Sequence, residues 1–476
     1  MANESSAEEY LNHNIPKEDI EQMEYHLKKI QEHQEHSFSF KRIDSASVNY
    51  YVYPGDTNIQ NVIWSCLPGD TVAFTPGVYT NIPYKGWGVP VPINIIGTEG
   101  AEKTIIDGGR RTRAFMTYTS SSTNILIKGF TISNCYYVGS GGAIQSQGAT
   151  TIKNCIFRNN ESGLAGAGVW AYTTTTISGS RFFNNRAGSY GAGAYLAGNS
   201  LARDCVFHMN EAKRNTWGAS IPSGGGVYMY TAGDRRNGIV NCTIAENTAT
   251  RGGGLFSFDF GNYCSNSIVC NNNVSNPCNG VYPEGTNYYV NQFFKFANTC
   301  TYSNPPSGVN CFSDNPRLIG CYPGWQSSCI DKLPTNITSR YDAEGTERPV
   351  TITNALTPCD IGAIEFQPTK EYQRRVLEFA SHFPPEIKRI DMAGTSTGIQ
   401  TRIYFPTIAS VLNTDKTDYF IEWRGNLRES QSPWQRVLPG TEGSGLEEHL
   451  DDSWVKTNEP NQRFYRVWKE IVYPDN

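Results

Sequence analysis

The segment GGGVYMY (residues 224–230) decides the fold, because closely related segments occur four more times in the chain. Each copy begins with glycine and runs into a short alternating segment that is typical of a β-strand. The five copies align without gaps: GGAIQSQ (141–147), GAGVWAY (166–172), GAGAYLA (191–197), GGGVYMY (224–230) and GGGLFSF (252–258). The first three start 25 residues apart, and the later spacings are 33 and 28. Repeats of roughly 20 to 50 residues indicate stacked coils.

A second strand-like segment lies between the glycine-led copies. Its copies end in asparagine: IKNCIFRNN (152–160), ISGSRFFNN (177–185), ARDCVFHMN (202–210) and IVNCTIAEN (239–247). Each repeat therefore holds two short strands and an Asn-containing turn, with no helical period. We predict an all-β fold, a right-handed parallel β-helix.

Side chains on a strand alternate between its two faces, so the columns of the stack can be assigned. In the first strand, the column Ile144, Val169, Ala194, Val227 and Leu255 is expected to point inward. In the second strand, Cys155, Ser180, Cys205 and Cys242 should stack beside Phe157, Phe182, Phe207 and Ile244. The turn position is shared by Asn160, Asn185, Asn210 and Asn247. We expect these amides to bond to their neighbours in adjacent coils, and we expect the glycines to permit positive φ and close approach.

Composition narrows the functional classes. The formal net charge of −5 gives no general case for nucleic acid or an anionic membrane, and no apolar run reaches the roughly 18 residues of a membrane span. The N-terminus is polar and acidic, without the basic and apolar regions of a signal peptide, so we expect either a cytosolic protein or a chain that begins after a removed signal. Eight of the 13 cysteines lie between Cys264 and Cys359, which suits disulfides made outside the cytosol. We therefore expect a secreted or cell-surface protein.

The cysteine pattern does not favour a metal site, because no zinc-type pair of C-x2-C motifs is present. We expect no metal and no cofactor. Cys205 and Cys242 would lie on adjacent coils, about 4.8 Å apart. A disulfide between them is sterically possible, and buried thiols are the alternative that we favour.

Three parts are predicted along the chain. Residues 1–45 form a helical N-terminal lead, amphipathic over 5–36, that could cap the first coil. Residues 46–368 form the β-helix, whose Cys-rich last coils over 276–358 are irregular and provide a C-terminal cover. Residues 369–476 form a separate, small C-terminal β module.

The repeats GGAI, GAGV and GGGL, alternating with CIFRNN and CVFHMN, resemble those of the chlamydial polymorphic membrane proteins. This resemblance covers about residues 125–275 and implies a β-helical surface adhesin. SDNPRL (313–318) and CDIGAIEFQ (359–367) resemble the closing segment of bacterial choice-of-anchor Q β-helix proteins, which implies export. YFIEWRGNL (419–427) and WQRVLPGTEGSG (434–445) resemble a C-terminal β-sandwich-like module of secreted Verrucomicrobia-type proteins.

The outward positions of the first strand are rich in aromatic residues. The two outward columns are Gln145, Trp170, Tyr195, Tyr228 and Phe256, and Gln147, Tyr172, Ala197, Tyr230 and Phe258. Seven of these ten residues are aromatic. If exposed, this aromatic strip suits stacking on sugar rings. The alternative is that the rings pair along the sheet for stability, or lie beneath the N-terminal lead or the C-terminal module.

Charged residues are expected at both edges of the aromatic strip. One edge has Lys213, Arg214 and Trp217 from the insertion 210–226, together with Arg186 and Arg251; the other has Asp234, Arg235, Arg236 and Asp259. A basic rim around an aromatic floor suits an acidic polysaccharide, with carboxylate or sulfate groups held by charge-assisted hydrogen bonds. The alternative is solvated loop charge.

A uronate lyase needs a cation to neutralise the substrate carboxylate and a base to remove the neighbouring proton. The candidate cations are Lys213, Arg214 and Arg236, and the candidate bases are Tyr228, Tyr230 and His208. His208 is predicted on a neighbouring face, where a structural role is the alternative. An inverting glycosidase would need two carboxylates about 6.5–9.5 Å apart, and the aromatic columns hold none.

The sequence thus predicts a polysaccharide-interacting β-helix that leans towards a lyase or another carbohydrate-active enzyme. The alternatives are a non-catalytic surface adhesin or structural protein, and a glycoside hydrolase. The predicted substrate contacts are Trp170, Tyr172, Tyr195, Trp217, Phe256, Phe258, Arg186, Arg251 and Asp259. The expected partner is a polysaccharide or a cell-surface glycan.

Overall fold

The computed structural model describes most of the β-helix and the strands that follow it. The described residues are 47, 49–118, 124–213, 221–231, 235–275, 287–302, 306–324, 327–334, 339–348, 359–367 and, in part, 369–376, together with the backbone of seven strands between 389 and 472. The helical lead predicted over 5–36 lies outside the described residues. Internal contacts divide the chain into two units. Unit 1 comprises 1–314, 332–349 and 359–364, and unit 2 comprises 315–331, 350–358 and 365–476.

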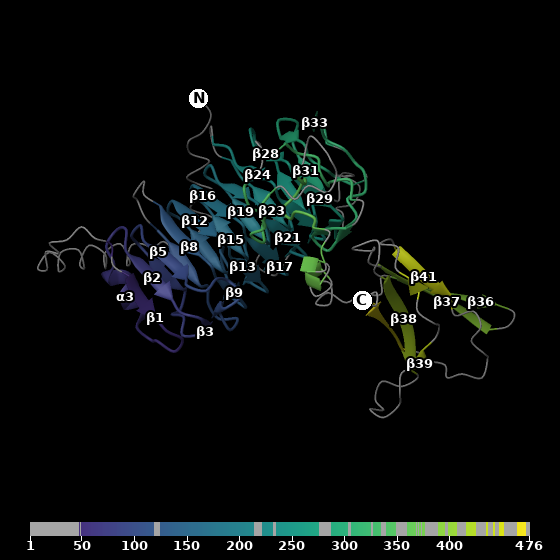
Figure 1. Ribbon diagram of the computed structural model, residues 1–476, viewed down its shortest axis with the longest axis horizontal. Coiled ribbons are helices and arrows are strands. Elements are labelled where there is room, and N and C mark those ends of the chain that lie inside the picture. The colour runs from purple at the N-terminus through teal and green to yellow at the C-terminus, as the bar shows by residue number, and fades with distance from the viewer. Residues whose placement is uncertain are drawn as a thin grey trace, which may run out of the picture. The chain divides into compact units, whose positions relative to one another are not determined.

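Unit 1 is a parallel β-helix, as the repeats predict (Figure 1). Each complete coil visits four sheets in the order C, A, B and D before the next coil starts again in sheet C. One such coil consists of β11 (Ile144–Ser146), β12 (Thr150–Lys153), β13 (Ile156–Arg158) and β14 (Glu161–Ser162). All pairings between coils in these sheets are parallel, so each strand lies beside its counterpart in the next repeat.

Sheet A is the longest sheet, and its strands are β1 (Asn49–Val52), β2 (Thr71–Phe74), β5 (Asn94–Gly97), β8 (Ile125–Lys128), β12, β16 (Thr175–Ser178), β20 (Leu201–Arg203), β24 (Gly238–Val240), β28 (Tyr263–Ser265), β32 (Lys295–Ala297) and β33 (Gly308–Val309). Sheet B contains β3 (Gly77–Tyr79), β6 (Thr104–Asp107), β9 (Thr131–Ser133), β13, β17 (Arg181–Phe183), β21 (Val206–His208), β25 (Thr243–Ala245) and β29 (Ile268–Cys270).

Sheet C contains β4 (Trp87–Val89), β7 (Phe115–Thr117), β11, β15 (Val169–Ala171), β19 (Ala194–Leu196), β23 (Val227–Met229), β27 (Leu255–Ser257) and β31 (Tyr288–Val290). Sheet D consists of the two-residue strands β10 (Tyr136–Tyr137), β14, β18 (Arg186–Ala187), β22 (Glu211–Ala212), β26 (Thr248–Ala249) and β30 (Asn273–Val274).

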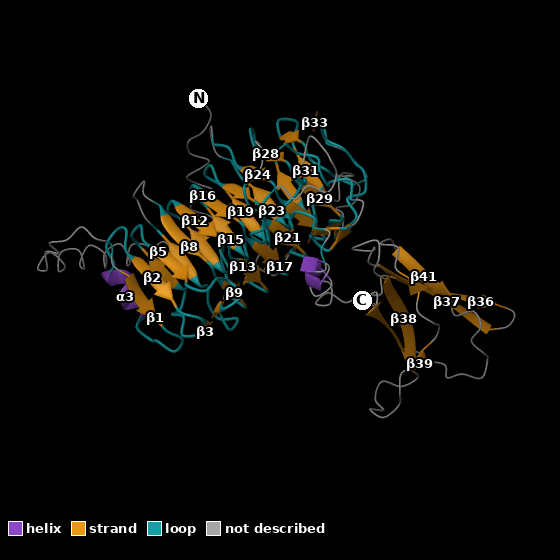
Figure 2. Cartoon of the chain, viewed as in Figure 1, coloured by secondary structure: helices purple, strands orange, loops and turns teal. Residues whose placement is uncertain are grey.

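A short helix, α3 (Ile59–Ser65), closes the N-terminal end of the stack, where Figure 2 shows it beside the first strands. It inserts Ile59 and Ile63 into the core, and the side-chain amide of Gln60 bonds to both the N–H and the C=O of Gly88 in β4. Open strand edges of a solenoid need such a cover. This helix was not predicted from the sequence.

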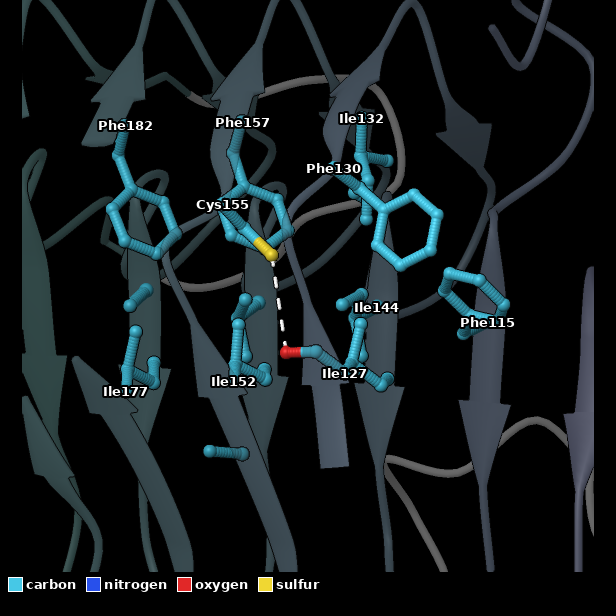
Figure 3. Close-up of a cluster of buried hydrophobic side chains, with 14 of the residues drawn as sticks. Phe115, Ile127, Phe130, Ile132, Ile144, Ile152, Cys155, Phe157, Ile177 and Phe182 are labelled. Carbon is cyan, nitrogen blue, oxygen red and sulfur yellow. Dashed lines mark hydrogen bonds between the residues drawn. The ribbon is translucent and has the colours of Figure 1, made fainter. Parts of the chain in front are cut away.

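The interior of unit 1 is built from columns of like residues. The rings of Phe157, Phe182 and Phe207 stack on one another with centroids 4.6 Å apart. Figure 3 shows Phe157 and Phe182 beside isoleucines from the facing strands, with the Cys155 thiol directed at the carbonyl oxygen of Ile127. The predicted inward column from Ile144 to Leu255 is fully buried. Close packing of these columns holds the coils in register.

An amide ladder runs between sheets B and D, at the turn position that the sequence indicates. Its buried members are Asn160, Asn185, Asn210, Asn247, Asn272 and Asn287. From Asn185 onward, each Oδ1 accepts hydrogen bonds from both the backbone N–H and the Nδ2 of the preceding asparagine, at 2.9–3.2 Å. The ladder therefore satisfies the backbone groups that a sharp turn would otherwise bury unpaired.

The triple glycine of GGGVYMY meets two requirements of the turn into sheet C. Gly224 has a φ of 65°, which side chains rarely tolerate. A Cβ on Gly225 or Gly226 would collide with the carbonyl oxygens of Gly253 and Gly254 in the next coil. The first glycine thus supplies the turn, and the other two allow adjacent backbones to approach.

A closing segment, residues 339–348 and 359–364, lies along the outward face of sheet B. Gly362 N–H bonds to the carbonyl oxygen of Asn266, and Ala363 N–H bonds to Oγ1 of Thr243, both at 3.0 Å. Arg181 pairs with Glu344 at 3.3 Å. Residues 339–348 of the predicted C-terminal cover therefore run along the side of the later coils, where the outward side chains of sheet B are buried.

In unit 2 the described strands after residue 388 pair antiparallel. They are β36 (Arg389–Thr395), β37 (Gly398–Pro406), β38 (Lys416–Arg424), β39 (Gln435–Arg436), β40 (Thr441–Glu442), β41 (Glu447–Asp451) and β42 (Phe464–Val472). A β-rich C-terminal part agrees with the sequence, and its β-sandwich-like character stays a prediction.

No disulfide joins any two of the 12 cysteines of the described residues, and 11 of these cysteines are buried. The disulfides expected from cysteine content are thus not seen in this part of the chain. Cys205 and Cys242 are the buried stacked thiols that we favoured. Burial raises the pKa of Cys66 and of Cys264 to about 12, so these thiols stay protonated and unreactive at neutral pH.

Replacing Asn210 by alanine should destabilise the β-helix by on the order of 3 kcal/mol, because the buried N–H groups of Asn185 lose their acceptor. Thermal and denaturant unfolding would measure the change. Asn61→Ala, at an exposed position of α3, is the matched control and should be nearly neutral. Equal stability of the two variants would contradict a supporting role for the ladder.

Thiol titration without reductant tests the cysteine assignment. The native protein should react slowly with a thiol reagent, since Cys311 is the one half-buried thiol among those described. After denaturation at least 12 thiols should react. A markedly lower number would show that disulfides form in the folded protein.

Candidate functional site

The outward aromatic residues of sheet C form a ladder of stacked rings. Trp170, Tyr195, Tyr228, Phe256 and Tyr289 occupy equivalent positions on consecutive coils. From Tyr195 onward the rings lie 5.0–5.2 Å apart with interplanar angles of 5–10°. The Trp170–Tyr195 contact is looser, at 6.3 Å and 32°.

This stacking changes what the aromatic strip can do. Because consecutive rings face one another one coil apart, their faces are already occupied and only ring edges remain for solvent. Trp170 and Phe256 are 7% and 5% exposed, and Gln145 at the equivalent position of β11 is 3% exposed. The arrangement supports the stability alternative for this column, since a sugar ring would need an open aromatic face.

The second outward column differs, because it ends at an open corner between sheets C and A. Tyr172 stacks on Trp170 at 5.0 Å, and Tyr230 lies 6.4 Å from Tyr195. Phe258 follows β27 directly, in the position that matches Tyr230 after β23, and is 63% exposed. Of the predicted strip, Phe258 is therefore the ring most available to a ligand.

Two further phenylalanines extend this corner. Phe260 is 62% exposed and Phe293, from the next coil, is 46% exposed. Their ring centroids lie 4.4 Å apart. Sequence reasoning missed both, because they follow the strands in turns outside the repeat columns. We call the set Tyr172, Tyr230, Phe258, Phe260 and Phe293, with Arg235, Arg236 and Asp259, the corner platform.

A buried polar network holds the corner platform in place. The Oδ1 of Asn262 accepts hydrogen bonds from Thr231 Oγ1 and from the N–H of Asn237, both at 2.7 Å. Asn237 in turn donates from Nδ2 to the carbonyl oxygen of Tyr230 at 2.7 Å. Since Asn237 and Asn262 are 0% exposed, the backbone around Tyr230 and Asp259 is fixed by groups that cannot exchange with water.

Asp259 is a half-buried carboxylate in the corner platform. Its Oδ2 accepts a 2.8 Å hydrogen bond from the N–H of Thr231, and among the described residues it forms no ion pair. Burial raises the pKa of Asp259 above its ordinary value, although the Thr231 hydrogen bond opposes this effect. Burial, and then the charge of Asp259, also raises the pKa of Tyr230. The Tyr230 phenol is therefore protonated at neutral pH.

Two exposed arginines flank the corner platform. The charge of Arg235 acts on Tyr172, whose pKa is nevertheless raised by burial and by Tyr230. The side chain of Arg236 passes over Gly261, directly after Phe260. Both arginines are exposed, and neither guanidinium forms an ion pair within the described part of the chain. Such cations attract anionic ligands.

The opposite edge of the aromatic strip is less basic than the sequence suggests. Arg186 and Lys213 both approach Glu211, at 3.5 and 3.8 Å, so one carboxylate partly compensates both cations. Arg251 is half-buried. Arg214, Trp217 and Asp234 lie outside the described residues.

His208 does not belong to the aromatic strip. It projects outward from β21 in sheet B, is 1% exposed, and its Nε2 lies 3.4 Å from Oε2 of Glu246. The structure therefore favours the structural alternative for this histidine over a role as a base beside Tyr228.

No group of three or more His, Cys, Asp or Glu that could hold a metal ion occurs among the described residues. In the same part of the chain, no helix has the length and apolarity needed to cross a membrane.

Residues 114–315 match the family described as right-handed β-helix region. The match agrees with the parallel coils of unit 1 and supplies their handedness. A comparison with curated proteins finds no match. The matched range includes the aromatic ladder and all of the corner platform.

Truncating the ladder should cost stability, whereas truncating the exposed corner should not. Tyr228→Ala removes stacking on both Tyr195 and Phe256, and should lower the free energy of unfolding by about 2 kcal/mol. Phe258→Ala, at a 63% exposed position, should change it by less than about 0.5 kcal/mol. Denaturant unfolding compares the two variants, and a reversed order would contradict this division of the aromatic strip.

Proposed function

We propose that this protein binds an anionic polysaccharide at the corner platform. The observation that carries the proposal is the pairing of exposed aromatic rings with two exposed arginines, Arg235 and Arg236, that form no ion pair within the described residues. Sugars present apolar C–H faces that pack on aromatic rings, while carboxylate or sulfate groups accept charge-assisted hydrogen bonds from guanidinium groups. The two requirements are met on one surface.

The architecture agrees with this class of ligand, because β-helix proteins are common among carbohydrate-active proteins. A solenoid also offers a long, rigid surface along which a polymer can lie. Polysaccharides of this type are extracellular, so the proposal includes a location outside the cell. The corner platform, rather than the self-stacked ladder, is the proposed contact.

A non-catalytic adhesin or structural protein is the second candidate. It is favoured by the stacked aromatic ladder and the continuous amide ladder, which both use side chains to stiffen the coil stack. Hydrolysis by a carboxylate pair has less support, because Asp259 is the one carboxylate in the described part of the corner platform.

Binding can be measured by affinity electrophoresis in gels that contain polygalacturonate, alginate or chondroitin sulfate. Arg235→Gln and Arg236→Gln should each weaken binding about five- to tenfold, and added salt should reduce binding of the wild type. Phe258→Ala should weaken it by a similar factor through lost stacking.

Lys213→Gln serves as the matched control, since this lysine lies on the opposite edge beside Glu211. It should bind like the wild type. If Lys213→Gln weakens binding while Arg235→Gln and Arg236→Gln do not, the binding surface is the other edge and the assignment to the corner platform is wrong.

A further inference from the structure

We propose that Asp259 and Tyr230 are the base and the acid of a β-elimination on a uronate-containing polysaccharide, with Arg235 neutralising the uronate carboxylate. This inference rests on the binding function proposed above and adds a reaction to the same site. It differs from the prediction that Tyr228 or Tyr230 is the base.

The backbone of Thr231 links Asp259 to the position of Tyr230. Asp259 accepts its hydrogen bond from Thr231, whose N–H belongs to the peptide bond that follows Tyr230. Tyr230 and Phe258 follow paired positions of β23 and β27, so Asp259 lies one residue beyond the partner position of Tyr230. The hydrogen bond uses Oδ2 and leaves Oδ1 as the acceptor for a substrate proton.

The raised pKa values of Tyr230 and Asp259 indicate which of the two is the acid and which is the base. A tyrosine that acts as a base must lose its proton near neutral pH, but burial and the charge of Asp259 raise the pKa of Tyr230 and oppose that loss. The same effects suit an acid that keeps its proton until the leaving oxygen needs it. Partial burial makes the Asp259 carboxylate a stronger base than a solvated one.

Asp259 and Tyr230 together account for both proton transfers of the elimination. Asp259 takes the proton from C5 of the uronate, and the electron pair of the broken C5–H bond forms the C4=C5 double bond. The C4–O4 bond breaks, and O4 takes the phenolic proton of Tyr230. Asp259 and Tyr230 then return to their starting protonation states by proton exchange with each other or with water. Arg235, whose charge reaches Tyr172, faces the uronate carboxylate and lowers the barrier to removing the C5 proton.

The experiment follows the ultraviolet absorbance of the unsaturated uronate with polygalacturonate, alginate and chondroitin sulfate, and measures binding to the same polymers. The wild type should generate the unsaturated product from at least one of them. Asp259→Asn and Tyr230→Phe should each lower kcat about 100-fold or more with little change in KM. Asn keeps an oxygen that can accept from Thr231, so the fold should be retained, which circular dichroism would check.

Tyr84→Phe, at a 72% exposed tyrosine near the other end of the stack, should leave the rate unchanged. The described ionisable groups at the corner are Asp259, Tyr230, Tyr172, Arg235 and Arg236. The value of kcat/KM should rise with pH as Asp259 loses its proton, and should fall only above the ordinary tyrosine pKa of about 10.

The outcomes separate the two proposals. Binding without unsaturated product on every polymer overturns the elimination and leaves the binding function in place. Absence of binding overturns both. Unsaturated product at an undiminished rate from Asp259→Asn or Tyr230→Phe shows that elimination occurs but that this pair does not carry it.

Discussion

Register between coils is the constraint on which the rest of the structure depends. A parallel coil must place each turn directly above the equivalent turn of its neighbour, and the amide ladder from Asn160 to Asn287 fixes that alignment with paired hydrogen bonds at every step. A shift by one residue would turn every inward side chain outward. It would also leave the buried N–H groups of the turns unpaired, which is costly inside a core. The apolar columns therefore provide burial, while the amides determine which stacking is allowed.

The same register determines whether outward side chains stack on one another or stay open to ligands. Once equivalent positions on sheet C are aligned, aromatic residues at those positions meet face to face and stack, as Tyr195, Tyr228 and Phe256 do. Their faces then contribute to stability and are lost to ligands. Side chains that bind a ligand are therefore expected where the repeat is interrupted. The corner after β27 is such a place, because Phe258 and Phe260 follow the strand and stay largely exposed, although Phe260 contacts Phe293 of the next coil.

The columns of the β-helix were predictable because each depends on residue type at a fixed spacing. The inward column through Val227 and the shared turn position of Asn210 follow directly from the 25-residue repeat and the alternation of strand side chains. Six of the eight residues of the corner platform were predicted from the sequence. Tyr230, Phe258 and Asp259 lie in or next to a repeat column, but Phe260 and Phe293 are turn residues whose exposure depends on the path of the chain. Strand alternation placed His208 outward, but it did not indicate its burial beside Phe183 and Glu246.

Charged side chains also differ between the regular repeat, where they pair, and the corner platform, where the described ones do not. Arg186 and Glu211 occupy paired positions of β18 and β22, so the stacking that aligns the coils also brings opposite charges together and compensates them. Arg235 and Arg236 lie just before β24, in a connection longer than the corresponding one in the preceding coil, and no carboxylate of the described residues is aligned with them. Asp259 avoids pairing for a similar reason, because a backbone N–H rather than a cation meets its Oδ2. A regular solenoid tends to pair its charges and stack its rings, so unpaired charge beside open rings requires a departure from the repeat. At the corner platform, both charged and aromatic side chains depart from the repeat.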